Sequence, residues 1–239
     1  DQFSWNLFLG ACIQNNEFHK AFHHFHQMQT QGLLPNKHTF LHILAACAGH
    51  NSISKGKLMH ALTLTTGLVS DIVLECALVN MYGKCGDFHN AKMIFDQMPK
   101  RDVALWSAIV TACANDGRNE EALHLFHQIY INNLLPDPIA YVAALNSCSN
   151  ACRSEDGLRI HTELIFFGYE KELQVGTSLV DMYGKFGALV KAQEVFDGLE
   201  AKNVVSWNAL IAGYSQHELG DKALDCFEKM KLCDSTPDE

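Results

Sequence analysis

The strongest constraint on the fold is an internal repeat, in which residues recur at a spacing of 101 positions. Trp5, Trp106 and Trp207 stand at this spacing, and the run Met-Tyr-Gly-Lys at 81–84 returns at 182–185. Self-similarity at a fixed period is typical of repeat proteins, in which each unit buries its apolar face against its neighbours. The sequence therefore predicts a row of stacked units rather than one globular core.

Each 101-residue block contains three related units of 35, 35 and 31 residues. In one unit, apolar residues recur at helical spacing from Val103 to Asn115 and from Asn119 to Tyr130, and Asp116-Gly117 separates the two patterns. Each unit is expected to form a helix-turn-helix hairpin, and the chain an all-α solenoid of about seven hairpins. The expected units are 2–36, 37–71, 72–102, 103–137, 138–172, 173–203 and 204–238.

Composition limits the class of protein. Apolar residues make up 48% of the chain, which is enough for a sizeable core and disfavours disorder. The sequence contains no run of 18 apolar residues, so we predict no membrane-spanning helix. The chain starts at Asp1 without a signal-peptide pattern, so we expect an excerpt of a longer protein. The net charge of −9 weighs against nucleic-acid binding, although net charge does not fix the charge of one groove.

The patterns that suggest chemistry are weak. Nine cysteines include no CxxC pair, and the pattern favours small buried thiols over a disulfide framework or a zinc site. His161-Thr162-Glu163 matches the H-x-E half of a nucleobase deaminase motif, but the C-x-x-C half is missing, so we interpret His161 as structural.

His19, His23 and His26 share one helical face, where metal capture would be adventitious. We therefore predict no catalytic site, no metal, no cofactor and no small-molecule substrate.

Several segments resemble pentatricopeptide repeats, among them VVSWNALIAGYSQHELGDKALDCFEKM at 204–230 and ALVNMYGKCGDFHNAKMIFDQMPKRD at 77–102. The 35, 35, 31 alternation resembles the PLS subclass of land plants, in the order P, L, S, P, L, S, P. The resemblance covers 237 of the 239 residues. It implies a right-handed solenoid that binds single-stranded RNA one base per repeat, parallel to the chain. A tetratricopeptide array would instead keep one 34-residue period.

By this resemblance, the base is contacted by the fifth and the last residue of each unit. The pairs with an implied base are Asn6 with Asn36 (C or U), Ser107 with Asp137 (G), Thr177 with Asn203 (A) and Asn208 with Asp238 (U). No base is assigned to Cys76 with Asp102, Leu41 with Asp71, or Val142 with Glu172. The implied target is 5′-Y-N-N-G-N-A-U-3′. Residues at the second position are expected to flank the base, and they include Phe3, Val73, Ala104, Gln174 and Val205.

Two of these assignments have a structural alternative. The last residues of the units precede helices, where Asp and Asn are ordinary N-caps, and capping is compatible with base contact. The tryptophans at the 101-residue spacing could stack on bases, but core packing is the favoured interpretation.

The resemblance implies a mitochondrial or chloroplast factor that marks a cytidine for C-to-U editing, with any deaminase outside this segment. Organellar editing accessory proteins are implied partners. The alternatives are a protein-binding scaffold, which the acidic charge favours, and an RNA processing or stability factor.

Overall fold

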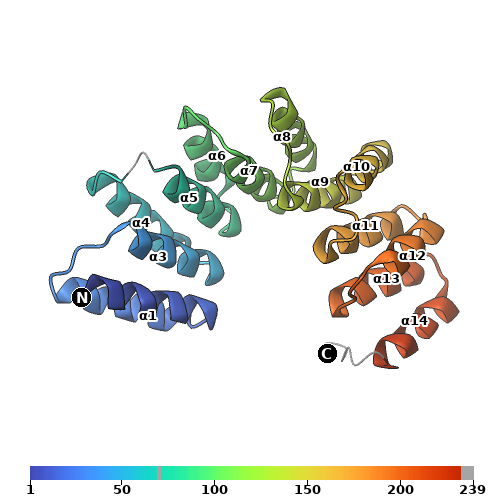
Figure 1. Ribbon diagram of the computed structural model, residues 1–239, viewed down its shortest axis with the longest axis horizontal. Helices are drawn as coiled ribbons and strands as arrows, with labels where there is room; N and C mark the ends of the chain where they lie inside the picture. Colours follow the sequence, from blue (N-terminus) through green and yellow to red (C-terminus); the bar gives the residue numbers. More distant parts are fainter. Residues whose placement is uncertain (69–70, 233–239) are drawn as a thin grey trace. The chain divides into compact units, whose positions relative to one another are not determined.

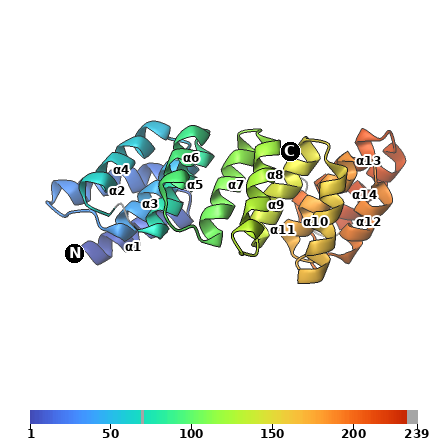
Figure 2. The same cartoon turned by 90° about the horizontal axis from the view of Figure 1, so that it is seen from above.

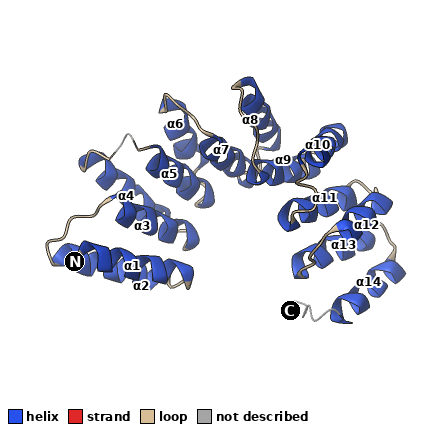
Figure 3. Ribbon diagram, in the orientation of Figure 1, coloured by secondary structure: helices blue, strands red, loops and turns tan. Residues whose placement is uncertain are grey.

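The computed structural model describes residues 1–68 and 71–232. These residues form fourteen helices and no strand (Figure 3), so the all-α prediction is confirmed. The helices are α1 Gln2–Gln14, α2 Phe18–Thr30, α3 Lys37–Gly49, α4 Ile53–Thr65, α5 Ile72–Lys84, α6 Phe88–Gln97, α7 Val103–Asn115, α8 Asn119–Ile131, α9 Pro138–Asn150, α10 Ser154–Phe167, α11 Leu173–Lys185, α12 Leu189–Gly198, α13 Val204–Gln216 and α14 Gly220–Leu232.

The odd-numbered helices begin at residues 2, 37, 72, 103, 138, 173 and 204, which are the first residues of the expected units. The turn inside each hairpin needs a residue with positive φ, which glycine and asparagine adopt at low cost. Gly86, Gly117 and Gly187 fill this position with φ of 71°, 76° and 72°. The assignment of units to the P, L and S types stays a prediction.

The chain divides into two compact units, Asp1–Gly117 and Arg118–Glu239, the second of which is described as far as residue 232. In the first, α1, α3, α5 and α7 pack one on the next, and α2, α4 and α6 cover them on one side (Figures 1 and 2). In the second, α9, α11 and α13 form the corresponding row, with α8, α10, α12 and α14 packed against it. Each of the two compact units is thus a two-layer stack of helical hairpins, which is the solenoid architecture that the sequence repeat predicted.

The core of each compact unit lies between its two layers of helices. Trp106 and Trp207 are 4% and 5% exposed, and their rings stand edge-on to Phe95 and Phe196 at centroid distances of 4.8 and 4.6 Å. Edge-to-face contacts of this kind stabilise aromatic cores. The core-packing interpretation is therefore confirmed for these two tryptophans, whereas Trp5 is half-buried beside His24.

The thiols behave as small core groups. Cys12, Cys47, Cys148 and Cys226 are buried, and burial raises the pKa of Cys47 and Cys148 to about 12. These thiols are protonated near neutral pH and are poor nucleophiles and metal ligands. In the described part of the chain, no three or more His, Cys, Asp or Glu side chains are grouped so that they could hold a metal ion. No described helix is both long enough and apolar enough to span a bilayer.

Candidate nucleic-acid interface

The second residue of each odd-numbered helix lies on an exposed edge of that helix. Residues three or four apart on a helix share a face, so the fifth residue of each unit lies one turn further along the same helix edge, where Ser107 is only 2% exposed. A single exposed apolar residue is ordinary on a protein surface. The exposed second residues are Phe3 (70%), His38, Val73 (48%), Ala104, Ile139 (57%), Gln174 and Val205 (60%).

The structure brings the first expected pair into contact. Asn6 Nδ2 donates to Asn36 Oδ1 at 3.2 Å, although the two residues are 30 positions apart. The hydroxyl of Thr39, which is fully buried, donates to Asn6 Oδ1 at 2.8 Å. The two amides therefore form one ordered, part-buried surface at the start of α3.

Two other fifth residues hold their hydroxyl protons within their own helices. Ser107 Oγ donates to Val103 O at 2.8 Å, and Thr177 Oγ1 donates to Leu173 O at 2.6 Å. A hydroxyl has one proton, so Thr177 can offer only its oxygen lone pairs to a ligand. Asn208, the fifth residue of α13, is exposed.

The last residues of the units are helix N-caps. Asn36, Asp71, Asp102, Asp137 and Asn203 each accept a hydrogen bond from a backbone N–H in the first turn of the following helix. Glu172 occupies the same place before α11 without a side-chain cap bond. Capping uses the Oδ1 atom, which leaves the outer atom of the same group for other contacts.

The second unit, 37–71, differs at this outer atom. Asp71 Oδ1 accepts from the N–H groups of Val73 and Leu74, and Asp71 Oδ2 lies 2.6 Å from Lys37 Nζ. The bond from Lys37 holds the pKa of the Asp71 carboxyl below its usual value. Both oxygens are engaged, and the expected partner Leu41 is apolar.

The structure describes the remaining expected pairs only in part. Cys76 Sγ lies 4.0 Å from Asp102 Oδ1, a weak contact. Ser107 belongs to the first compact unit and Asp137 to the second. Val142 is half-buried on α9 and Glu172 is exposed. Asp238, the expected partner of Asn208, lies outside the described residues.

The acidic excess of the chain lies outside the odd-numbered helices. Between their first and last residues, these seven helices carry three lysines and two acids, namely Lys37, Lys84, Lys185, Glu75 and Asp181. Since only local charge acts on a ligand within a Debye length, the net charge of −9 says little about this edge. The capping carboxylates are the main negative groups beside it.

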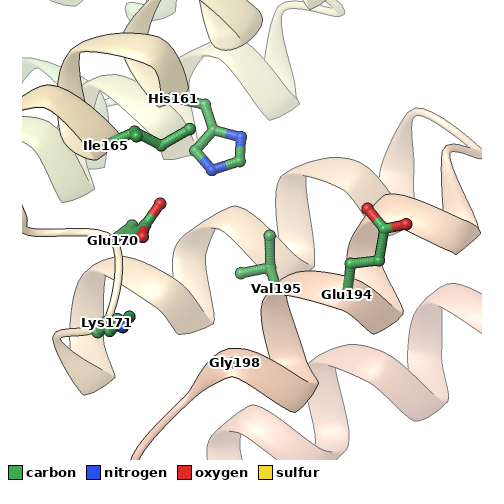
Figure 4. Close-up of a pocket in the computed structure, with 7 residues that line it drawn as sticks. All are labelled: His161, Ile165, Glu170, Lys171, Glu194, Val195 and Gly198. Atoms are coloured by element: carbon green, nitrogen blue, oxygen red, sulfur yellow. The ribbon is translucent and has the colours of Figure 1, made fainter.

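The H-x-E residues serve the core. His161 Nδ1 is 2.6 Å from Tyr183 Oη, and Glu163 Oε2 accepts from Tyr130 Oη at 2.5 Å. A pocket of about 210 Å³ lies beside His161, between α10 and α12 (Figure 4). In that view the His161 ring and the Glu170 carboxylate face the same space, and Val195 lies across from them. No described residue adds the cysteines of a deaminase site.

Sequence reasoning missed Thr39 and Lys37. A pattern around the caps could have revealed Thr39. The two units that end in Asn are followed, three residues later, by a hydroxyl residue, Thr39 or Ser206. Units that end in Asp are followed at the same place by Leu74, Leu105 and Ala140.

The stacked hairpins define a helical-repeat protein, in which Asn6 and Asn36 form a polar pair within the first unit. The chain belongs to the pentatricopeptide repeat family. One model, described as "PPR repeat family", matches residues 1–49 and 202–239, and a second, "PPR repeat", matches 76–103, 104–132 and 177–204.

Its relatives include pentatricopeptide repeat-containing proteins of Arabidopsis thaliana. One is 33% identical over 241 residues, which covers 100% of this chain and 24% of the relative. Two others, named chloroplastic and mitochondrial, are 32% identical, over 99% and 98% of this chain and 28% and 23% of theirs. The chain spans about a quarter to a third of the length of the first relatives it matches.

Solved structures share the fold. The crystal structure of the pentatricopeptide repeat protein PPR10, in complex with an 18-nt psaJ RNA element, superimposes with a TM-score of 0.75 at 20% identity. It matches 98% of this chain and 35% of that one. PPR10 from maize, in another crystal structure, gives a TM-score of 0.67 at 20% identity, over 98% of this chain and 34% of that one.

Proposed function

We propose that this chain binds single-stranded RNA along the exposed edge of its odd-numbered helices, with one base at each unit. The observation that carries the proposal is the contact between Asn6 and Asn36, which joins the fifth and last residues of one unit into a single polar surface. PPR10, whose fold this chain shares, was crystallised with RNA. The exposed second residues, such as Phe3 and Val205, supply apolar surface on which bases can stack.

The sixth unit, 173–203, shows how a pair could discriminate between bases. Thr177 offers lone pairs, because its proton is bound to Leu173 O. Asn203 accepts the Ser206 N–H at Oδ1, at 2.9 Å, so its Nδ2 donors are left for a base. An acceptor beside a donor complements N6 and N1 of adenine, which supports the assignment of A to this pair. Cytosine offers the same order of groups on a smaller ring.

The biological role extends the same proposal. Relatives named chloroplastic and mitochondrial favour an organellar protein. We infer that the whole protein marks a site in an organellar transcript for C-to-U editing, with accessory editing proteins as further partners. RNA processing or stabilisation would use the same binding edge.

The test is selection of bound RNA from a random pool at two salt concentrations, with wild-type chain and Asn203→Asp. Aspartate also caps, so the bond from the Ser206 N–H is kept, but its outer atom is an acceptor instead of a donor. Guanine presents N1–H and N2–H donors, so preference at the sixth base should move from A to G, by about 1–3 kcal/mol.

Thr177→Val, which removes the acceptor but keeps the side-chain shape, is the matched control. It should weaken the preference for A in the wild-type chain and the preference for G in Asn203→Asp. If Asn203→Asp still preferred A at the sixth base, the assignment of A to Thr177 and Asn203 would be refuted. Absence of RNA binding even at low salt would instead favour a protein-binding scaffold.

A further inference from the structure

We propose that Thr39, a buried residue that meets no base, fixes which hydrogen-bonding groups Asn6 and Asn36 present and so sets the base preference of the first unit. The proposal rests on the RNA-binding function proposed above. Thr39 is the third residue of α3 and is 0% exposed. Its hydroxyl lies within hydrogen-bonding distance of both amides, at 2.8 Å from Asn6 Oδ1 and 3.0 Å from Asn36 Oδ1.

Two backbone N–H groups, which can only donate, set the direction of this network. The N–H of Thr39 is 3.0 Å from the Asn36 side chain, so the atom of Asn36 that faces the helix must be Oδ1. The N–H of Asn36 donates to Thr39 Oγ1 at 3.2 Å, so the hydroxyl proton is left for another acceptor. The orientation of the Asn36 amide therefore follows from the backbone, whereas the Asn6 amide is oriented by Asn36 Oδ1 and by the Thr39 hydroxyl.

The remaining bonds can be assigned one by one. Asn36 Oδ1 accepts from the Thr39 N–H and from Asn6 Nδ2, which fills its two lone pairs. The Thr39 hydroxyl proton then goes to the nearer acceptor, Asn6 Oδ1. What is left for a ligand is one N–H of Asn6, both N–H of Asn36 and one lone pair of Asn6. The pair presents mainly donors.

A donor-rich pair favours bases that present acceptors. Both pyrimidines offer carbonyl oxygens, and cytosine adds N3, whereas the Watson–Crick edge of guanine offers two donors, N1–H and N2–H, and only one acceptor, O6. Without the hydroxyl, Asn6 Oδ1 loses its donor, and the amide can turn so that its oxygen faces the base. Thr39 therefore excludes guanine by holding the Asn6 oxygen inward.

The experiment compares Thr39→Val, Thr39→Ser and Ser206→Ala. Ser206 stands at the same place in α13, but its hydroxyl donates to the backbone oxygen of Asn203 at 2.9 Å and to no fifth residue. Binding is measured to RNAs of the proposed target sequence that carry either a pyrimidine or guanine at the first base. Thr39→Val should lower the discrimination against guanine at least about fivefold, the equivalent of one hydrogen bond. Thr39→Ser should retain it, and Ser206→Ala should leave it unchanged.

A folded Thr39→Val chain, checked by circular dichroism, that still discriminates against guanine like wild type would overturn the proposal. A second measurement needs no RNA: the ¹⁵N side-chain amide signals of Asn6 and Asn36 should shift in Thr39→Val and stay in place in Ser206→Ala. If the wild-type chain bound no RNA, the proposed function would fail. Unmoved amide signals in Thr39→Val would separately refute the network.

Discussion

In five units the last residue caps the next helix with a short polar side chain, and the proposed function gives the same side chain a second task. The sequence predicted the caps well, because Asp or Asn directly before an amphipathic pattern is a local signal. It also predicted that Asn6 and Asn36 form a pair, through the family resemblance. It could not predict that Lys37 binds Asp71, since a whole hairpin separates these residues in the chain and only packing brings them together.

This ion pair predicts a conditional gain of base specificity in the second unit, 37–71. Leu41→Thr alone should give less than about a twofold preference at the second base, because both Asp71 oxygens stay engaged by the cap and by Lys37. Leu41→Thr combined with Lys37→Met should free Oδ2 and create a preference for guanine of about fivefold or more.

Fluorescence anisotropy with RNAs that differ only at the second base measures both variants, and Lys37→Met alone is the control. Equal guanine preference in the single Leu41→Thr variant and the double variant would show that Lys37 does not block Asp71.

At the scale of helices, neighbouring odd-numbered helices touch through very small residues. A Cβ added to Gly83 on α5 would lie 2.4 Å from Ala112 Cβ and 3.0 Å from its Cα, on α7. Gly184 on α11 meets Gly213 on α13 in a similar way, with 3.1 Å from the added Cβ to the Gly213 Cα. The Met-Tyr-Gly-Lys run recurs in the sequence, but the sequence alone could not show which backbone its glycine approaches.

Gly83→Ala should therefore lower the free energy of unfolding by about 1–3 kcal/mol, because the added methyl group forces α5 and α7 apart. Gly220→Ala is the matched control. An added Cβ there meets nothing within 4 Å, so the greater helix propensity of alanine should raise stability by up to about 1 kcal/mol. Urea unfolding followed by circular dichroism measures both, and a neutral or stabilising Gly83→Ala would contradict the close approach.

At the scale of the molecule, the 101-residue period also repeats contacts. His60 Nδ1 lies 2.9 Å from Tyr82 Oη, and His161 Nδ1 lies 2.6 Å from Tyr183 Oη. Tyr130 and Tyr141 share Glu163 in the second compact unit. Burial raises the pKa of Tyr82 and Tyr141 to about 12, and it also raises the pKa of Tyr183 and Tyr214. The helix layers are held together by phenols that must stay protonated.

Stability should consequently fall at alkaline pH. Tyr82 and Tyr141 keep their protons in the folded chain but lose them in the unfolded chain above about pH 10. Their contribution to stability is complete below about pH 10 and is lost as the pH rises toward about 12, at up to about 1.4 kcal/mol per pH unit for each tyrosine.

Tyr141→Phe should lower stability by about 1 kcal/mol near pH 8, because its hydrogen bonds are lost, and should make the alkaline decline less steep. Urea titrations from pH 8 to 11.5 compare the two proteins. Parallel stability–pH curves would show that Tyr141 does not take part in this proton linkage.

The double use of the capping position restricts how such a chain can evolve. Five of the six described last residues close a helix with an Asp or Asn side chain, and Glu172 is the exception, so under the proposed function most bases are recognised by a few short polar residues. An exchange between Asn36 or Asn203 and aspartate alters one outward atom and keeps the helix end closed. New base preferences can thus be acquired by single substitutions that barely change the stability of the fold. A substitution to a residue that cannot cap would alter the base preference and destabilise the following helix at the same time.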